Sequence, residues 1–255
     1  MARREKRPQG PLPPPLPPET RTVGQLLAET IRTYGQHFVR AVPLGLVVAI
    51  SNQLALDRTI REQIAIFLVA APFFTFAYAD ATRLVTGVRP AAEEWLVALV
   101  VGTIVFLPAA ALIPWFKLAV VVWLAVIGLV VPAALVERTS FRESFARALA
   151  LGRVDYVHGI GALAALVLIF GMAESGLALL LESQADNTVR SAIFLADTVL
   201  GPLLFLGGAV LYVDQDARLR SRGDRGKERD AHVPAAHDAH GEGRADAARE
   251  PGAPA

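Results

Sequence analysis

The sequence predicts an all-α protein, a polytopic transmembrane helical bundle of about six spans with two amphipathic helices on the cytoplasmic side. The composition is strongly apolar, since 53% of the 255 residues are hydrophobic and the mean hydropathy is +0.42. Residues 96–136 contain a single charged residue, Lys117. As one helix this run would be roughly 60 Å long, about twice the hydrocarbon thickness of a bilayer. The run must therefore be two spans joined by a tight turn.

The chain begins with a basic, proline-rich segment, and residues 1–21 are expected to be a disordered tail. Thr22 and Gln25 then have the spacing of a capping box, which predicts the start of a helix. This helix is amphipathic, and the apolar residues expected on one face are Val23, Leu27, Ile31, Tyr34 and Phe38. It either lies in the headgroup plane or packs as a cytoplasmic helix on the bundle.

The six spans are expected at residues 41–56, 64–79, 95–113, 116–136, 157–181 and 192–213. The turn between the third and fourth spans is placed at Pro114–Lys117, because a turn at Pro108 would leave the third span too short. The first two spans are the weakest, and a hairpin that enters and leaves the same side is the alternative for them. Residues 22–218 thus form the membrane domain, and residues 219–255 are expected to be a second disordered tail.

Basic residues predict the orientation of the spans. Of the 25 Lys and Arg residues, 21 lie on the side that carries both termini. The other 4 are Arg58, Arg61, Lys117 and Arg190. We therefore expect a multi-pass membrane protein with both termini in the cytoplasm.

The connector at residues 137–155 has a pattern of its own. Ser140 and Glu143 form a second possible capping box, and Phe141, Phe145 and Leu149 recur every four residues. This predicts a short helix on the inner leaflet with its apolar face toward lipid, or alternatively a helix that caps the bundle. The arginines expected to contact lipid headgroups are Arg142, Arg147, Arg153, Arg218 and Arg220.

Several segments together resemble a known family. They are the helix Val23–Tyr34, a proline-broken pair of spans, Val131–Glu137, Phe141–Arg147, and Leu211–Asp214 with Arg218 beyond it. Over residues 22–218 the chain resembles the bacterial six-span integral membrane family related to the membrane domain of glycerophosphoryl diester phosphodiesterases. That family often has a Trp and more basic residues where this chain has Phe145 and Ala146. The resemblance implies the fold and topology but no hydrolase activity, because the catalytic domain of the phosphodiesterases has no counterpart here.

The sequence contains no motif for nucleotide binding or hydrolysis. The absence of Cys excludes disulfides and thiolate chemistry. We expect no cofactor, no metal site and no nucleic-acid partner, and His232, His237 and His240 are read as part of a non-coordinating tail. The expected partners are the lipid bilayer and other membrane proteins or a second copy of the chain.

Two acidic residues stand out inside the apolar segments. Glu174 and Asp197 both fall in the outer third of their spans, so they could approach one another. An ionisable group in a span is a candidate functional site, although Glu174 could also reach the outer interface or bond to a neighbouring helix. Two carboxylates alone would repel, so one would hold a proton or Arg190 would join them.

Three functions follow from this pattern. The first is a non-enzymatic membrane scaffold, accessory or envelope-homeostasis component. The second is a small-molecule or lipid transporter or exporter that uses a polar pocket near Glu174 and Asp197. A lipid-modifying enzyme is the third and the least supported, because no catalytic constellation is visible. A cavity reaching the middle of the membrane would favour the transporter over the scaffold.

Overall fold

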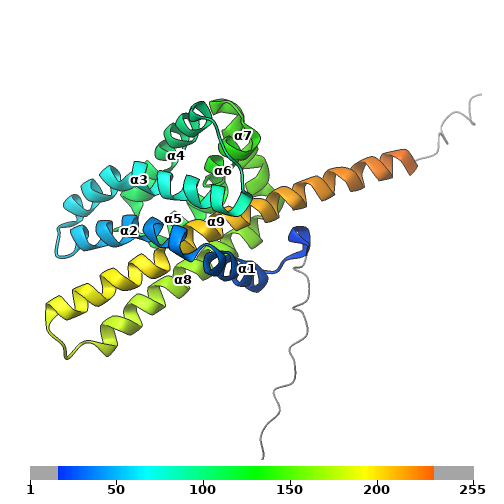
Figure 1. Cartoon of the computed structure of the whole chain (residues 1–255). Coiled ribbons are helices and arrows are strands. Elements are labelled where there is room, and N and C mark those ends of the chain that lie inside the picture. The colour runs from blue at the N-terminus through cyan, green and yellow to red at the C-terminus, as the bar shows by residue number, and fades with distance from the viewer. Residues whose placement is uncertain (1–16, 233–255) are drawn as a thin grey trace, which may run out of the picture. The chain divides into compact units, whose positions relative to one another are not determined.

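The computed structural model describes residues 17–232, and over this part the chain is helical with no strand. Its elements are η1 (Pro18–Thr20), α1 (Val23–Gln36), α2 (Phe38–Ala55), α3 (Ile60–Thr86), α4 (Ala92–Leu112), α5 (Lys117–Ile127), α6 (Val130–Glu137), α7 (Phe141–Val154), α8 (Tyr156–Leu180) and α9 (Asp186–His232). The chain divides into two compact units, and the first ends at Arg218. Figure 1 shows the course of the helices.

Within the described residues, six segments are long and apolar enough to cross a membrane. They are α2, α3, α4, α5 with α6 as the single segment Lys117–Glu137, α8, and α9 as far as Asp224. The predicted all-α polytopic bundle is confirmed. The turn at Pro114–Lys117 is also confirmed, because α4 ends at Leu112 and α5 begins at Lys117.

Ion pairs identify the two ends of the first unit. We call them the turn end, where the α2–α3 and α8–α9 turns lie, and the tail end, where α6 ends and α4 begins. At the turn end, Arg190 at the start of α9 pairs with Asp57 between α2 and α3. At the tail end, Arg138 after α6 pairs with Glu94 at the start of α4, at 3.1 Å. Since the α2–α3 turn lies beside the α8–α9 turn, α2 and α3 run the length of the bundle rather than forming a short re-entrant hairpin.

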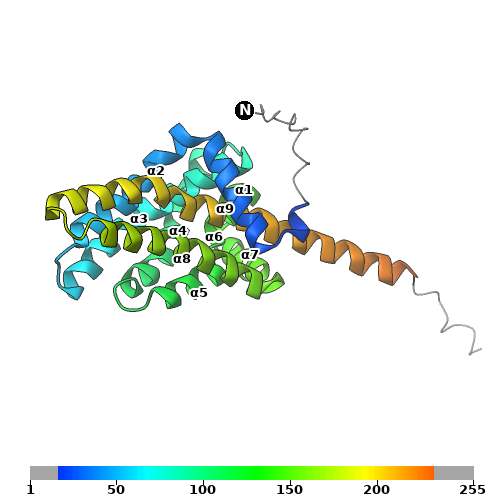
Figure 2. The same ribbon diagram turned by 90° about the horizontal axis from the view of Figure 1, so that it is seen from below.

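Helix α9 packs closely against several neighbours because small residues line its contacts. Gly201 lies opposite α2, where a Cβ would come within 3.1 Å of the Gly45 Cα. Gly208 lies against the Tyr78 ring of α3, where a Cβ would come within 3.0 Å of the nearest ring carbon. Figure 2 shows α8 and α9 side by side. Small residues at helix contacts and large apolar residues outside are typical of membrane bundles.

The fourth span is broken rather than continuous. Helix α5 ends at Ile127 and α6 begins at Val130. Pro132 explains the break, because it has no N–H to donate to the carbonyl of Gly128 four residues earlier. Gly128 and Leu129 therefore carry the chain between two short helices.

Helix α1 begins at the predicted capping box, in which the Thr22 side chain accepts from Gln25 N and the Gln25 side chain accepts from Thr22 N. The buried residues are Leu26, Thr30, Thr33 and Tyr34. Of the predicted apolar face, Tyr34 is therefore buried, whereas Ile31 is 60% exposed and Phe38 is 47% exposed. Helix α1 packs on α8, so the alternative of a helix packed on the bundle is the one observed.

Helix α7 also begins at its predicted capping box, formed by Ser140 and Glu143. It packs on α5 and α6 through Ser144, Ala148, Leu151 and Gly152. Phe141 lies outside this contact and is 46% exposed, with its ring tilted by 56° against that of Phe145 at a centroid distance of 5.3 Å. The helix therefore packs on the bundle through Leu151 and small residues and leaves Phe141 outside.

The two tails differ from expectation where the structure describes them. Pro18–Thr20 form a 3-10 turn, and Arg21 pairs with Asp214 in α9 at 2.9 Å, so residues 17–21 are ordered. In the second unit, α9 continues as a helix to His232, so residues 219–232 are helical rather than disordered. Residues 1–16 and 233–255, with His237 and His240, lie outside the described residues.

Candidate functional site: a central cavity with an acidic pair

Two carboxyl groups and an amide meet near the turn end of the first unit. Asn52 of α2 donates from Nδ2 to Glu174 Oε1 of α8 at 3.4 Å and to Asp197 Oδ2 of α9 at 3.0 Å. The two carboxyls also contact one another. The structure thus brings Glu174 and Asp197 together, as the sequence suggested, and adds Asn52 between them.

The local packing explains why these three residues meet. Gly45 lets α2 approach the backbone of α9 at Thr198, one residue beyond Asp197. Two turns further along α2, Asn52 is held at the same close spacing and reaches the acidic pair. Arg190, the predicted third partner of the carboxylates, instead pairs with Asp57.

The two acidic residues differ in their surroundings. Asp197 is 1% exposed, and its Oδ1 has no hydrogen-bond partner in the described part of the chain. Glu174 is partly exposed and lines a cavity. Neighbouring carboxylates repel unless a proton lies between them, and an acidic pair of this kind can therefore hold and release one proton.

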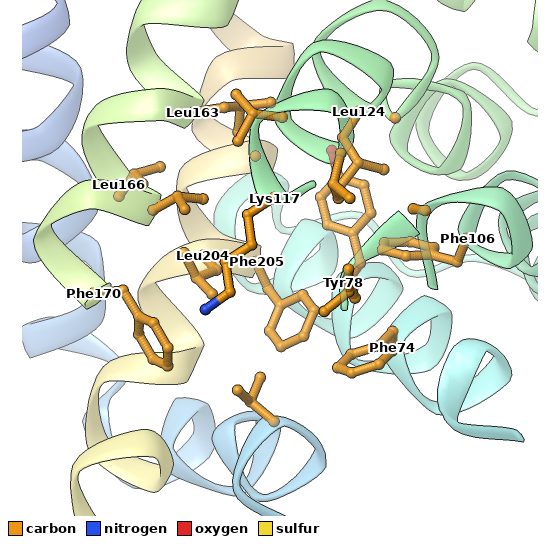
Figure 3. Close-up of a pocket in the computed structure, with 18 of the residues that line it drawn as sticks. Phe74, Tyr78, Phe106, Lys117, Leu124, Leu163, Leu166, Phe170, Leu204 and Phe205 are labelled. Atoms are coloured by element: carbon orange, nitrogen blue, oxygen red, sulfur yellow. The ribbon is translucent and has the colours of Figure 1, made fainter. Parts of the chain in front are cut away.

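The cavity, called the central cavity here, has a volume of about 270 Å³ and is lined by residues of α2, α3, α4, α5, α8 and α9. Its walls are mainly aliphatic and aromatic side chains (Figure 3). The polar lining residues are Asn52, Tyr78, Lys117 and Glu174. Of these, Asn52, Lys117 and Glu174 lie toward the turn end, so the cavity is polar at one end and apolar along its length.

Lys117 is a site residue that the sequence analysis did not identify. It is the first residue of α5, and its side chain extends into the central cavity (Figure 3). Its charge acts on Glu174 through space. The signal was present in the sequence, because Lys117 is the single charge in residues 96–136, but the sequence pattern placed it only in the turn between two spans, on the side away from the termini.

A cluster of ion pairs closes the tail end of the bundle. Arg147 of α7 donates to Glu137 of α6 and to Asp216 of α9, each at 2.7 Å, and the Tyr212 hydroxyl also donates to Glu137, at 2.9 Å. Burial opposes the charged form of Arg147, but the hydrogen bond and the charges of Glu137 and Asp216 outweigh it and raise the pKa of Arg147. A second pair joins Arg218 to Asp155.

These contacts involve two of the arginines that were predicted to contact headgroups. Arg147 and Arg218 bond to carboxylates inside the first unit. Arg142 and Arg153 are exposed on α7 and remain candidates for headgroup contact. Arg220 belongs to the second unit and is exposed. Among the residues described, no cluster of His, Asp and Glu could hold a metal ion.

Comparisons with known proteins add no relative. No protein-family model matches the chain, and neither a curated protein nor a solved structure is similar to it.

Proposed function

We propose that this protein is a carrier, a transporter or exporter of a small molecule or lipid, whose substrate site is the central cavity and whose ionisable group is the acidic pair of Glu174 and Asp197. The observation that carries the proposal is a cavity lined by six helices, with polar groups from three of them gathered at one end. Discontinuous helices around a polar site are typical of transporters. The break between α5 and α6 lies on the cavity wall, at Gly128 and Leu129.

The size of the central cavity, about 270 Å³, supports a carrier over a scaffold. A carrier needs a space that can hold its ligand, whereas a scaffold has no use for one. The non-enzymatic scaffold, accessory or envelope-homeostasis component remains the competing hypothesis, and it predicts a cavity that water never enters. Enzymatic activity is not part of the proposal.

The proposed setting is a bacterial plasma membrane with both termini in the cytoplasm, as the excess of basic residues at the tail end favours. In this orientation the acidic pair and Lys117 lie in the outer half of the membrane. The proposal also includes a relation to the membrane domain of glycerophosphoryl diester phosphodiesterases, which rests on the sequence resemblance alone.

The test uses the natural absence of Cys, which allows one introduced thiol to be followed without background. Leu124→Cys places the thiol on the cavity wall, roughly 10 Å along α5 from the turn end. The matched control is Ile104→Cys, at a similar depth on α4 but 45% exposed on the outer surface and absent from the cavity wall. Both are treated from outside intact cells with a membrane-impermeant methanethiosulfonate.

We expect rapid labelling at Leu124→Cys and none at Ile104→Cys, because water reaches the cavity but not the lipid-facing surface. Equal resistance of the two thiols would show a dry interior and would support the scaffold. Equal labelling would show that the reagent enters through lipid or unfolded protein, which would also count against a specific cavity.

A further inference from the structure

Lys117 occupies an unusual position for a charged side chain. It begins α5 at the turn end, where a lysine in a span normally extends outward to water. Instead, its side chain runs into the central cavity, whose walls there include Phe170, Leu204 and Phe205 (Figure 3). Glu174 acts on it through space, but Lys117 forms no ion pair or hydrogen bond in the part of the chain that the structure describes.

Lys117 is exposed at the turn end of the cavity, where Glu174 also lines the wall. Asn52 donates to both Glu174 and Asp197, and a proton held between the two carboxyls leaves that pair with a single negative charge. Lys117 is the one basic residue among the residues that line the central cavity, and a long apolar surface lies behind it. An anionic headgroup followed by an apolar tail would match this arrangement.

We propose that Lys117 recognises the headgroup of the ligand, and that the central cavity takes a single-chain amphiphilic organic anion, with a carboxylate, sulfonate or phosphate head and an apolar tail. The volume of about 270 Å³ lies just below the ~300–1,000 Å³ of typical ligand sites, which fits one chain better than a two-chain lipid. This inference rests on the proposed carrier function and specifies its substrate class.

The experiment measures charge preference inside the cavity. Leu124→Cys protein in nanodiscs is treated with the anionic reagent 2-sulfonatoethyl methanethiosulfonate or its cationic trimethylammonium counterpart, and each rate is divided by that of a small free thiol. We expect the anion-to-cation ratio to fall about tenfold on adding Lys117→Met, and to be preserved by Lys117→Arg. Arg61→Met is the control, because it removes a charge that is exposed at the same end but lies outside the cavity.

A second measurement tests the amphiphile directly. Dodecane-1-sulfonate, below its micellar concentration, should slow labelling of Leu124→Cys, and dodecyltrimethylammonium should not. Protection by sulfonate should be lost with Lys117→Met and kept with Arg61→Met.

The outcomes separate the two proposals. Labelling that shows no dependence on Lys117, or stronger protection by the cation, overturns the anion assignment and leaves the water-filled cavity standing. Failure of both reagents to label Leu124→Cys overturns the carrier proposal and the anion assignment together.

Discussion

Replacing Arg147 by Met should destabilise the bundle by about 2–3 kcal/mol. The side chain is 26% exposed and bonds to Glu137 and Asp216 at 2.7 Å. A hydrogen bond between charged groups contributes about 1.5–3 kcal/mol, and removing one partner leaves carboxylates partly buried without their cation. Met retains the packing of the aliphatic stem, and Glu137 keeps its bond from Tyr212, so the loss should stay below that of two such bonds.

The assay is reversible unfolding in nanodiscs, followed by the fluorescence of the three tryptophans. Arg142→Met is the matched control, since Arg142 lies on the same helix but is exposed, and its stability should change by no more than about 0.5 kcal/mol. A double-mutant cycle with Glu137→Gln should give a coupling free energy of at least about 1 kcal/mol. Equal effects of Arg147→Met and Arg142→Met would refute the reasoning and would return Arg147 to the class of headgroup contacts.

Three further predictions concern topology, packing and pH. A reporter fused after Gly152 should indicate the cytoplasm and one fused at Asn187 the opposite side, and a cytoplasmic signal at Asn187 would break the six-span topology. Gly45→Leu should lower stability by about 1–3 kcal/mol, because its side chain would collide with the backbone of α9, whereas Gly176→Leu, which has open space, should be tolerated in the same unfolding assay. Hydrogen bonds from the backbone N–H and the hydroxyl of Ser140 lower the pKa of Glu143 below its ordinary 4.5, so this cap should stabilise α7 fully above pH 4.5 and lose its effect as the pH falls through the lowered pKa. Helicity followed against pH should show this step in the natural chain and not in Glu143→Gln.

Local signals in the sequence were sufficient for the helix starts. Thr22 and Ser140 cap their helices as predicted, and the turn at Pro114–Lys117 lies where the length of the apolar run required it. These features depend on a few neighbouring residues, or on the thickness of a bilayer, which does not depend on the rest of the chain.

The residues of α1 and α7 that contact the bundle could not be predicted from apolar periodicity alone, because large apolar side chains can also face lipid. On α7 Phe141 lies outside the bundle contact, which includes Ser144 and Ala148. On α1 Thr30 is buried and Ile31 is exposed. Lipid solvates large apolar side chains as well as a protein interior does, so close packing of small residues decides the contact surface.

The candidate site was predicted only in part, because some of its residues are brought together by the close packing of helices. Glu174 and Asp197 were recognisable because charge inside a span is rare. Asn52 was not recognised as a site residue, since its role depends on how closely α2 approaches α9 at Gly45. The direction of Lys117 depends on the packing of several helices, which sequence periodicity does not encode.

The most direct test of the carrier proposal is the movement of amphiphiles across a membrane by purified protein. Proteoliposomes contain one of three fluorescent single-chain probes, with an anionic, zwitterionic or cationic head, and dithionite added outside quenches only the outer leaflet. The account predicts that the wild-type chain moves the anionic probe faster than protein-free vesicles do, and that Glu174→Gln, which keeps shape and hydrogen bonding but cannot ionise, folds normally and loses this activity. Movement of no probe above the protein-free rate, or full activity in Glu174→Gln, would contradict it.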